Sequence, residues 1–113
     1  MLEELTRRVV GFRDERDWKQ FHSPRNLAVS ISVQAAELLE LFQWSSDDSL
    51  AEDLAARHDD VERGLADVLI YALLLAHDSD IDLEGAITRK LAENASKYPA
   101  EKAKGSRRKY TDL

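Results

Sequence analysis

The amino-acid sequence predicts an all-α fold, and three observations support this prediction. Apolar residues recur every three or four positions along most of the 113-residue chain, as they do on one face of a helix. No segment alternates apolar and polar residues over a useful length, as a half-buried strand would. The composition, with 43% hydrophobic and 34% charged residues, is typical of a helix-rich globular domain.

The first two helices are separated by a proline. The first is expected over about residues 2–21, where Leu5, Val9 and Phe12 share one face. It should end before Pro24, because proline disfavours helical backbone in the preceding residue, yet proline suits the first turn of the next helix. The second helix is therefore expected over about residues 24–44. It is apolar on more than one side, which in so short a chain predicts a subunit interface.

Three further helices follow. A short one is expected to start near Ser46, which can cap it, and to end near residue 56. The fourth is expected over about residues 59–77, before the connection DSDID. Asp82 can cap the last helix, over about residues 83–98, which Pro99 stops. We expect one helical domain over residues 1–100 and a basic C-terminal tail over residues 101–113.

Composition and charge exclude several classes of function. The chain has no cysteine, which excludes disulfides, thiolate metal sites and thiol catalysis. No apolar run is long enough for a membrane span and no signal-peptide region is visible, so we expect a cytoplasmic protein without a membrane partner. The net charge of −6 argues against binding to a nucleic-acid polymer. Residues 102–109 nevertheless hold five bases and no acid. This segment could be a solvated terminus or an arm that helps to hold polyphosphate.

Polar side chains interrupt the two most apolar helices. Gln34, Glu37 and Glu40 lie within the second helix, and Asp67 begins the most apolar stretch of the fourth. A carboxylate in such surroundings costs free energy unless a cation meets it. Helical bundles build divalent-metal sites from acids on facing helices, so this pattern indicates chemistry on a metal-bound, phosphorylated ligand.

Helical spacing groups these residues on three faces. Gln34 and Glu37 edge the core face of the second helix, whereas Glu40 is rotated further away. On the fourth helix, Asp60, Gly64, Asp67 and Tyr71 fall in line, and on the last helix Lys90, Asn94 and Lys97 do the same. If these helices share a bundle, one cavity holds carboxylates that suit Mg²⁺ and lysines that suit phosphate oxygens.

Ordinary structural roles are open for each of these residues. Glu37 and Glu40 could be surface residues, and Asp67 could pair with a lysine or arginine. The stripe of Lys90, Asn94 and Lys97 could be a solvated face. Trp18, Trp44 and Tyr71 could be core aromatics rather than platforms for a nucleobase.

At this point the sequence resembles a known family. The blocks RDWKQFHSPRNLAVSISVQAAELLELFQW, LADVLIYALLLA and ITRKLAENASKYP, which span about residues 16–98, are similar to the MazG-like nucleotide pyrophosphohydrolases, closest to the small dCTP-pyrophosphatase type. The resemblance implies a four-helix-bundle protomer that assembles into a homodimer or homotetramer. It also implies Mg²⁺-dependent hydrolysis of a (deoxy)nucleoside triphosphate to the monophosphate and pyrophosphate.

The family's functional positions carry over only in part. The resemblance implies that Glu37 and Asp67 are catalytic and metal-binding, whereas Gln34 and Gly64 stand where the family has two more glutamates. Gln34 keeps a carbonyl oxygen and could ligate weakly, Gly64 offers no side chain, and either Asp60 or Glu40 could partly substitute. The residues expected around the substrate are Trp18, His22, Trp44, Tyr71, Lys90, Asn94 and Lys97.

The sequence therefore predicts a pyrophosphohydrolase that cleans the nucleotide pool, with activity weakened by the two lost ligands. Glu37 is the first candidate to activate water and Glu40 the second. One alternative is a nucleotide-binding or regulatory protein that kept the pocket and lost the chemistry. The other is a structural helical oligomer whose acids pair with lysines.

Overall fold

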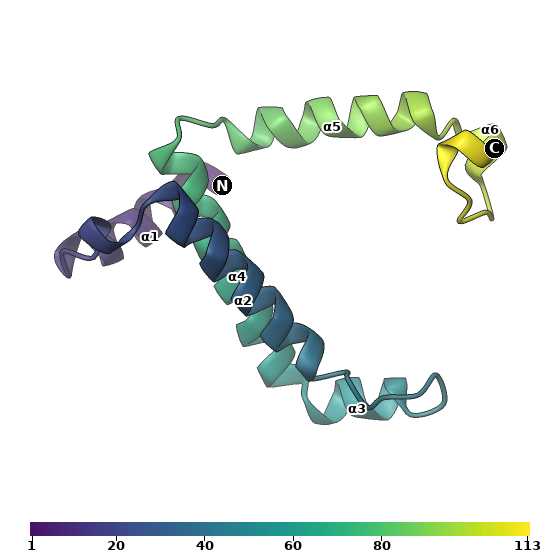
Figure 1. Cartoon of the computed structure of the whole chain (residues 1–113), viewed down its shortest axis with the longest axis horizontal. Helices are drawn as coiled ribbons and strands as arrows, with labels where there is room; N and C mark the ends of the chain where they lie inside the picture. Colours follow the sequence, from purple (N-terminus) through teal and green to yellow (C-terminus); the bar gives the residue numbers. More distant parts are fainter. The chain divides into compact units, whose positions relative to one another are not determined.

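The computed structural model describes all residues, 1–113, and they form helices and turns without a strand (Figure 1). The elements are α1 (Leu2–Glu15), η1 (Lys19–Phe21), α2 (Pro24–Glu40), α3 (Leu50–Ala56), α4 (His58–Asp78), α5 (Leu83–Lys97), α6 (Ala100–Ala103) and η2 (Tyr110–Asp112). The all-α prediction is confirmed. The chain divides into two compact units, Met1–Asp80 and Ile81–Leu113, and each is described by itself.

The first unit is built around α2 and α4, which lie side by side (Figure 1). The two helices run antiparallel, because His22 near the start of α2 meets Tyr71 late in α4, while Leu38 near the end of α2 meets Gly64 early in α4. Helix α1 also packs against α4. The buried hydrophobic side chains, Leu27, Leu73, Leu74 and Ala76, come from α2 and α4.

Helices α2 and α5 begin at side-chain caps. The Ser23 hydroxyl accepts a hydrogen bond from the Asn26 N–H at 3.1 Å, and Pro24 occupies the first turn, where no N–H donor is needed. Asp82 accepts from the Gly85 N–H at 3.2 Å, as its position before the last helix predicts. The predicted helices over 59–77 and 83–98 are confirmed to within one residue at each end.

Three predicted helix ends are wrong. Helix α1 ends at Glu15 rather than near residue 21, because Asp17 adopts a left-handed backbone with φ 52°, which a helix cannot continue. Helix α2 ends at Glu40 rather than at residue 44. The next helix starts at Leu50 rather than near Ser46, because Ser46 and Ser49 instead bond each other's backbone N–H groups in a turn, at 2.9 and 3.1 Å.

The second unit consists of α5 and the segment that follows it. The predicted tail contains α6 and η2, and Gly105 turns the chain between them with φ 76°. The Tyr110 ring lies edge-on to the Tyr98 ring, with centroids 5.9 Å apart, so the segment returns to the C-terminal end of α5. Neither unit contains a helix long and apolar enough to cross a bilayer.

Candidate active site

Gly64 of α4 lies against Leu38 of α2. A Cβ atom at this position would lie 3.1 Å from Cδ1 of Leu38, tighter than ordinary van der Waals contact. The absence of a side chain at Gly64 therefore leaves room for the side chain of Leu38. This contact sets the turn of α2 that carries Gln34 and Glu37 against the turn of α4 that carries Asp67.

The two predicted catalytic acids lie near this contact in the sequence. Glu37 precedes Leu38 by one residue, and Asp67 precedes the half-buried Val68 by one residue. Each residue is rotated by about 100° around the helix axis from the next one. Because the helices are antiparallel, the step from Leu38 to Glu37 and the step from Val68 to Asp67 lead to the same side of the pair. Both carboxylates are therefore on one side of the α2–α4 pair. Gln34 is half-buried and closer to the line of contact.

These carboxylates have no cationic partner in the chain. Ion pairs of the first unit join other groups, and none includes Glu37, Glu40 or Asp67. Both Glu37 and Asp67 are exposed. The structural alternative in which Asp67 pairs with a lysine or arginine is therefore absent from the isolated chain. Asp60, one turn before Gly64, instead pairs with Arg63 at 3.3 Å.

Two of the predicted substrate residues meet at the other end of the helix pair. The rings of His22 and Tyr71 lie 6.3 Å apart at 74°, an edge-to-face arrangement. The Nδ1 atom of His22 is buried without a hydrogen-bond partner. Trp18 lies edge-on to Phe12 at 5.8 Å and is 45% exposed. Trp18 is thus half of an aromatic pair and is partly exposed.

Glu40 and Trp44 line a small cavity where α2 gives way to α3. Its volume is about 120 Å³, and its lining residues are Glu40, Leu41, Trp44, Ser45, Asp53 and Arg57. Hydroxyl donors Ser45 and Ser49, at 2.6 and 2.8 Å, hold the pKa of the Asp53 carboxyl below its ordinary value. Trp44 is 89% exposed, so it does not belong to the core of this unit.

The predicted polar stripe of the last helix lies on α5, in the second unit. Lys97 Nζ lies 3.1 Å and Lys90 Nζ 3.5 Å from Glu93, so one acid serves both lysines. The hydrogen bond to Glu93 raises the pKa of Lys97, and Lys97 in turn lowers the pKa of Glu93. Sequence reasoning missed Glu93, although its spacing of three and four from the lysines is the ordinary signal of helical ion pairs. Asn94 is exposed on the same helix.

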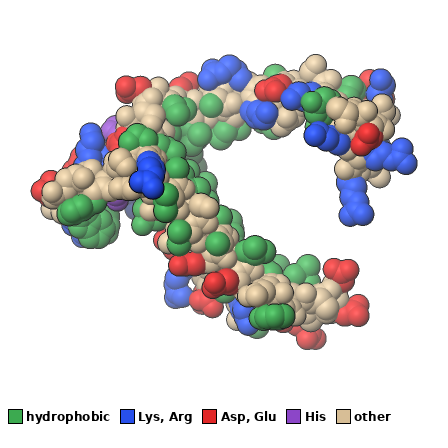
Figure 2. Space-filling view, in the orientation of Figure 1, with side chains coloured by type: hydrophobic (Ala, Val, Ile, Leu, Met, Phe, Trp, Pro, Cys, Tyr) green, Lys and Arg blue, Asp and Glu red, His purple; other side chains and the backbone are tan.

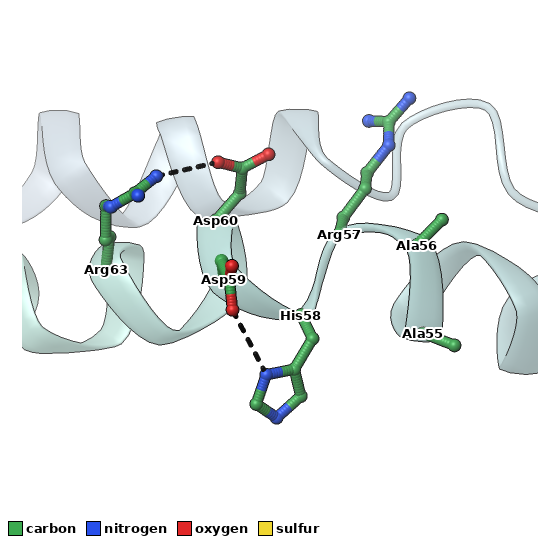
Figure 3. Close-up of a pocket in the computed structure, with 7 residues that line it drawn as sticks. All are labelled: Ala55, Ala56, Arg57, His58, Asp59, Asp60 and Arg63. Atoms are coloured by element: carbon green, nitrogen blue, oxygen red, sulfur yellow. Dashed lines mark hydrogen bonds and ion pairs between the residues drawn. The ribbon is translucent and has the colours of Figure 1, made fainter.

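A further cavity, of about 320 Å³, lies where α3 meets α4 (Figure 3). Arg57, His58, Asp59, Asp60 and Arg63 line it with two alanines. His58 Nδ1 lies 3.8 Å from Asp59 and 3.7 Å from Glu62, and these three groups are exposed. None belongs to the predicted site. Their contacts are those of a solvated charged helix start.

Comparison with known proteins identifies the family. The sequence pattern of the MazG-like family matches residues 29–113. The chain belongs to the MazG-like family. It is 43% identical to dCTP pyrophosphatase 1 of Rattus norvegicus over 117 residues, which cover 99% of this chain and 67% of that protein. It is 40% identical to dCTP pyrophosphatase 1 of Homo sapiens over 114 residues, with the same coverage.

A solved structure agrees with these relatives. A crystal structure of a pyrophosphatase from Archaeoglobus fulgidus matches with a TM-score of 0.83 at 49% identity, covering 86% of this chain and 91% of that one. The predicted resemblance to MazG-like pyrophosphohydrolases is confirmed. The roles of individual residues stay predictions.

Proposed function

We propose that this chain hydrolyses a deoxynucleoside triphosphate, with dCTP as the first candidate, to the monophosphate and pyrophosphate. The relatives that match it along nearly its whole length are dCTP pyrophosphatases, the enzyme class predicted from the sequence. Such an activity suits removal of unwanted nucleotides from the pool. The observation that carries the proposal is a pair of carboxylates without cationic partners, Glu37 and Asp67, on neighbouring helices.

The donor set fits a divalent metal ion. Glu37 and Asp67 offer carboxylate oxygens and Gln34 an amide oxygen, and hard cations such as Mg²⁺ prefer oxygen ligands. Because Gln34 is neutral and Gly64 has no side chain, the set carries less charge than four acids would, which predicts weaker Mg²⁺ binding. Glu40 is a further acid within one turn of Glu37. When bound, the ion supplies neutralisation of negative charge on the phosphates and on leaving pyrophosphate.

The chain's own residues then act on water and substrate. Glu37 accepts a proton from water as the water oxygen bonds to the α-phosphorus, the one next to the nucleoside. The bond between the α-phosphorus and the oxygen of the leaving pyrophosphate then breaks. Glu40 is the second candidate for the proton. Lys90 and Lys97 hold the phosphates electrostatically, which requires exchange of part of their contact with Glu93.

Aromatic and amide groups hold the nucleoside. The edge-to-face pair of His22 and Tyr71 and the accessible faces of Trp18 and Trp44 offer stacking surfaces for a base. Asn94 offers both a donor and an acceptor for the sugar. Unchanged tryptophan fluorescence on saturation with dCTP and Mg²⁺ would exclude both tryptophans from the base site.

The active form is a homodimer or homotetramer in which helices complete a four-helix bundle. Helices α2 and α4 expose large apolar side chains, and Figure 2 shows hydrophobic groups along them. These side chains include Val29, Val33, Leu39, Leu65 and Leu69. Burying them in a second copy is favourable at about 25 cal/mol per Å². A folded species of 12.8 kDa in light scattering at micromolar concentration would contradict this assembly.

The second candidate is a nucleotide-binding protein with little or no turnover. Gln34 and Gly64 favour it, because they stand at two positions where the resemblance implies glutamate ligands. Thermal unfolding with Mg²⁺ and a panel of deoxynucleotides, together with pyrophosphate release, separates the two. Stabilisation with turnover supports the enzyme, and stabilisation without turnover supports the binder. If neither stabilisation nor turnover is observed, the remaining alternative is a structural helical oligomer.

A further inference from the structure

The C-terminal segment is folded back by contacts that the sequence pattern did not predict. Tyr110 lies edge-on to Tyr98, and Lys97 Nζ lies 4.9 Å above the Tyr110 ring, within the range of cation–π attraction. Backbone bonds from Ser106 N–H to Ala103 and from Asp112 N–H to Lys109, at 2.9 and 2.8 Å, close turns on either side. The segment therefore returns to the end of α5 that carries Lys97.

The cations of this segment have no acidic partner. We refer to Lys102, Lys104, Arg107, Arg108 and Lys109 as the basic arm. All five are exposed, and none takes part in an ion pair, whereas Lys90 and Lys97 on the adjoining helix share Glu93. Lys and Arg side chains gather over this part of the chain in Figure 2. In a chain with a net charge of −6, five unpaired cations within eight residues leave a local site for an anion.

The chemistry of the arm favours phosphate groups. Guanidinium groups bind phosphate through two parallel N–H donors, and lysines add point charges. Lys97 belongs both to the anchor of the arm, through Tyr110, and to the helix stripe proposed to hold phosphates. The arm is therefore attached at the Lys97 end of the proposed stripe. A triphosphate carries several negative charges, more than Lys90 and Lys97 can neutralise while Glu93 is between them.

We propose that the basic arm is a second polyphosphate subsite, which Tyr110 positions and which holds the triphosphate of the substrate through Arg107 and Arg108. This inference rests on the proposed function, since it assigns a role to the arm within the same reaction. It makes the segment from residue 102 to residue 113 part of the substrate site rather than a solvated terminus. Tyr110 is a positioning residue, and the arginines contact substrate.

The test compares two adjacent pairs of arginines. The variant Arg107→Gln/Arg108→Gln removes two charges from the arm, and Arg7→Gln/Arg8→Gln removes two exposed charges from α1 as the matched control. Calorimetry with inorganic tripolyphosphate measures anion binding without a nucleotide, and initial rates with dCTP measure KM and kcat. The arm variant should bind tripolyphosphate about tenfold more weakly, as the loss of charge-assisted hydrogen bonds implies, and should raise KM more than it lowers kcat. The control should leave both quantities unchanged.

A second pair of variants tests the anchor. Tyr110→Phe keeps the ring that meets Tyr98 and Lys97, so its tripolyphosphate affinity should match that of the unmodified protein. Tyr110→Ala removes the ring and should reproduce a large part of the loss seen with the arginine variant. Circular dichroism shows whether each variant keeps its helices.

The outcomes separate the arm from the proposed function. Equal tripolyphosphate affinity in the arm variant and in the α1 control overturns the subsite, whether or not dCTP is hydrolysed. A change in oligomeric mass with unchanged affinity also overturns it and makes the arm a contact between copies. Loss of tripolyphosphate binding in a protein that hydrolyses no nucleotide supports the subsite and rejects the proposed function.

Discussion

Two of the aspartates on helix α4, Asp78 and Asp67, are in opposite situations. Asp78 accepts hydrogen bonds from Nη1 and Nη2 of Arg13 at 2.7 and 2.9 Å, and the two side chains are 8% and 2% exposed. Asp67, about three turns earlier, is exposed and has no ion pair. The same residue type on one helix is thus part of an ion pair at one end and without an ion pair in the middle. The difference lies in what each carboxylate meets.

The bond to Arg13 gives Asp78 a defined structural role. The two-pronged hydrogen bond joins α1 to the C-terminal end of α4, and it holds the pKa of the Asp78 carboxyl below its ordinary value. No equivalent group reaches Asp67 or Glu37. If these acids have a cationic partner, it must come from outside the chain, as a metal ion does. Four predictions test this contrast, from the largest expected effect to the smallest.

Arg13→Met should lower the free energy of unfolding by about 3–5 kcal/mol, because it leaves a buried carboxylate without its counter-charge. Urea unfolding measures this change. Arg8→Met, at an exposed position on the same helix, should stay within about 0.5 kcal/mol of the unmodified protein. The double variant Arg13→Met/Asp78→Leu should recover much of the loss. Equal stability of Arg13→Met and Arg8→Met would show that the pair does not hold α1 to α4.

Glu37→Gln and Asp67→Asn should each reduce pyrophosphate release from dCTP by about 100-fold, or about 2.7 kcal/mol in the barrier, while leaving urea unfolding nearly unchanged. Neither change breaks an ion pair, since neither acid has one. Glu62→Gln, an exposed acid of α4 outside the proposed site, is the control and should retain full activity. Full activity of Asp67→Asn would instead make this residue an ordinary surface acid.

The variant Gln34→Glu/Gly64→Glu should strengthen Mg²⁺ binding, by about tenfold for each added carboxylate, although neighbouring ligands are not additive. Calorimetry with Mg²⁺ alone gives the affinity, and the dependence of pyrophosphate release on Mg²⁺ gives a second measurement. Without metal the variant should be less stable, since more like charges then share one site. Gly64→Ala separates the steric contribution. Unchanged Mg²⁺ affinity would reject Glu37 and Asp67 as the remaining ligands.

The smallest effect concerns pH. Because the pKa of Asp78 is lowered in the folded state by its bond to Arg13, the unfolded chain takes up the proton first as the pH falls. The resulting stabilisation is complete above the unfolded pKa, near 4, and is lost as the pH falls through the folded value. Urea unfolding between pH 3 and 6 measures this loss. In Asp78→Asn, the decline below about pH 4 should be shallower than in the unmodified protein.

Local signals in the sequence were sufficient for much of the fold. Proline placed the start of α2, Asp82 placed the start of α5, and apolar spacing placed α4. The end of α1 could not be predicted in the same way, because it depends on the left-handed backbone of Asp17. This conformation is uncommon for residues other than glycine, and an aspartate does not by itself predict it. Apolar spacing predicts where a helix runs, and it predicts helix ends poorly where the backbone conformation of a single residue ends the helix.

Long-range pairing was beyond the reach of the sequence pattern. Asp78 lies at the start of a run of acids that reads as a connection, and its partner Arg13 is 65 residues away. Nothing in the spacing joins them, because the contact depends on how α1 packs on α4. The proposed site was more accessible to prediction, since Gln34, Glu37 and Asp67 interrupt apolar helices. Only the structure shows that neither Glu37 nor Asp67 has an ion-pair partner within the chain.

At residue 64, close packing against Leu38 and a negatively charged side chain exclude each other. Glycine within a helix costs about 1 kcal/mol relative to alanine, yet here it lets Leu38 fill the space in which a longer side chain would begin. A glutamate would add a ligand for a cation only by pushing that leucine aside. The present sequence therefore favours close contact of α2 and α4 over the density of negative charge between them. A gain in catalytic power at this position should come with looser helices.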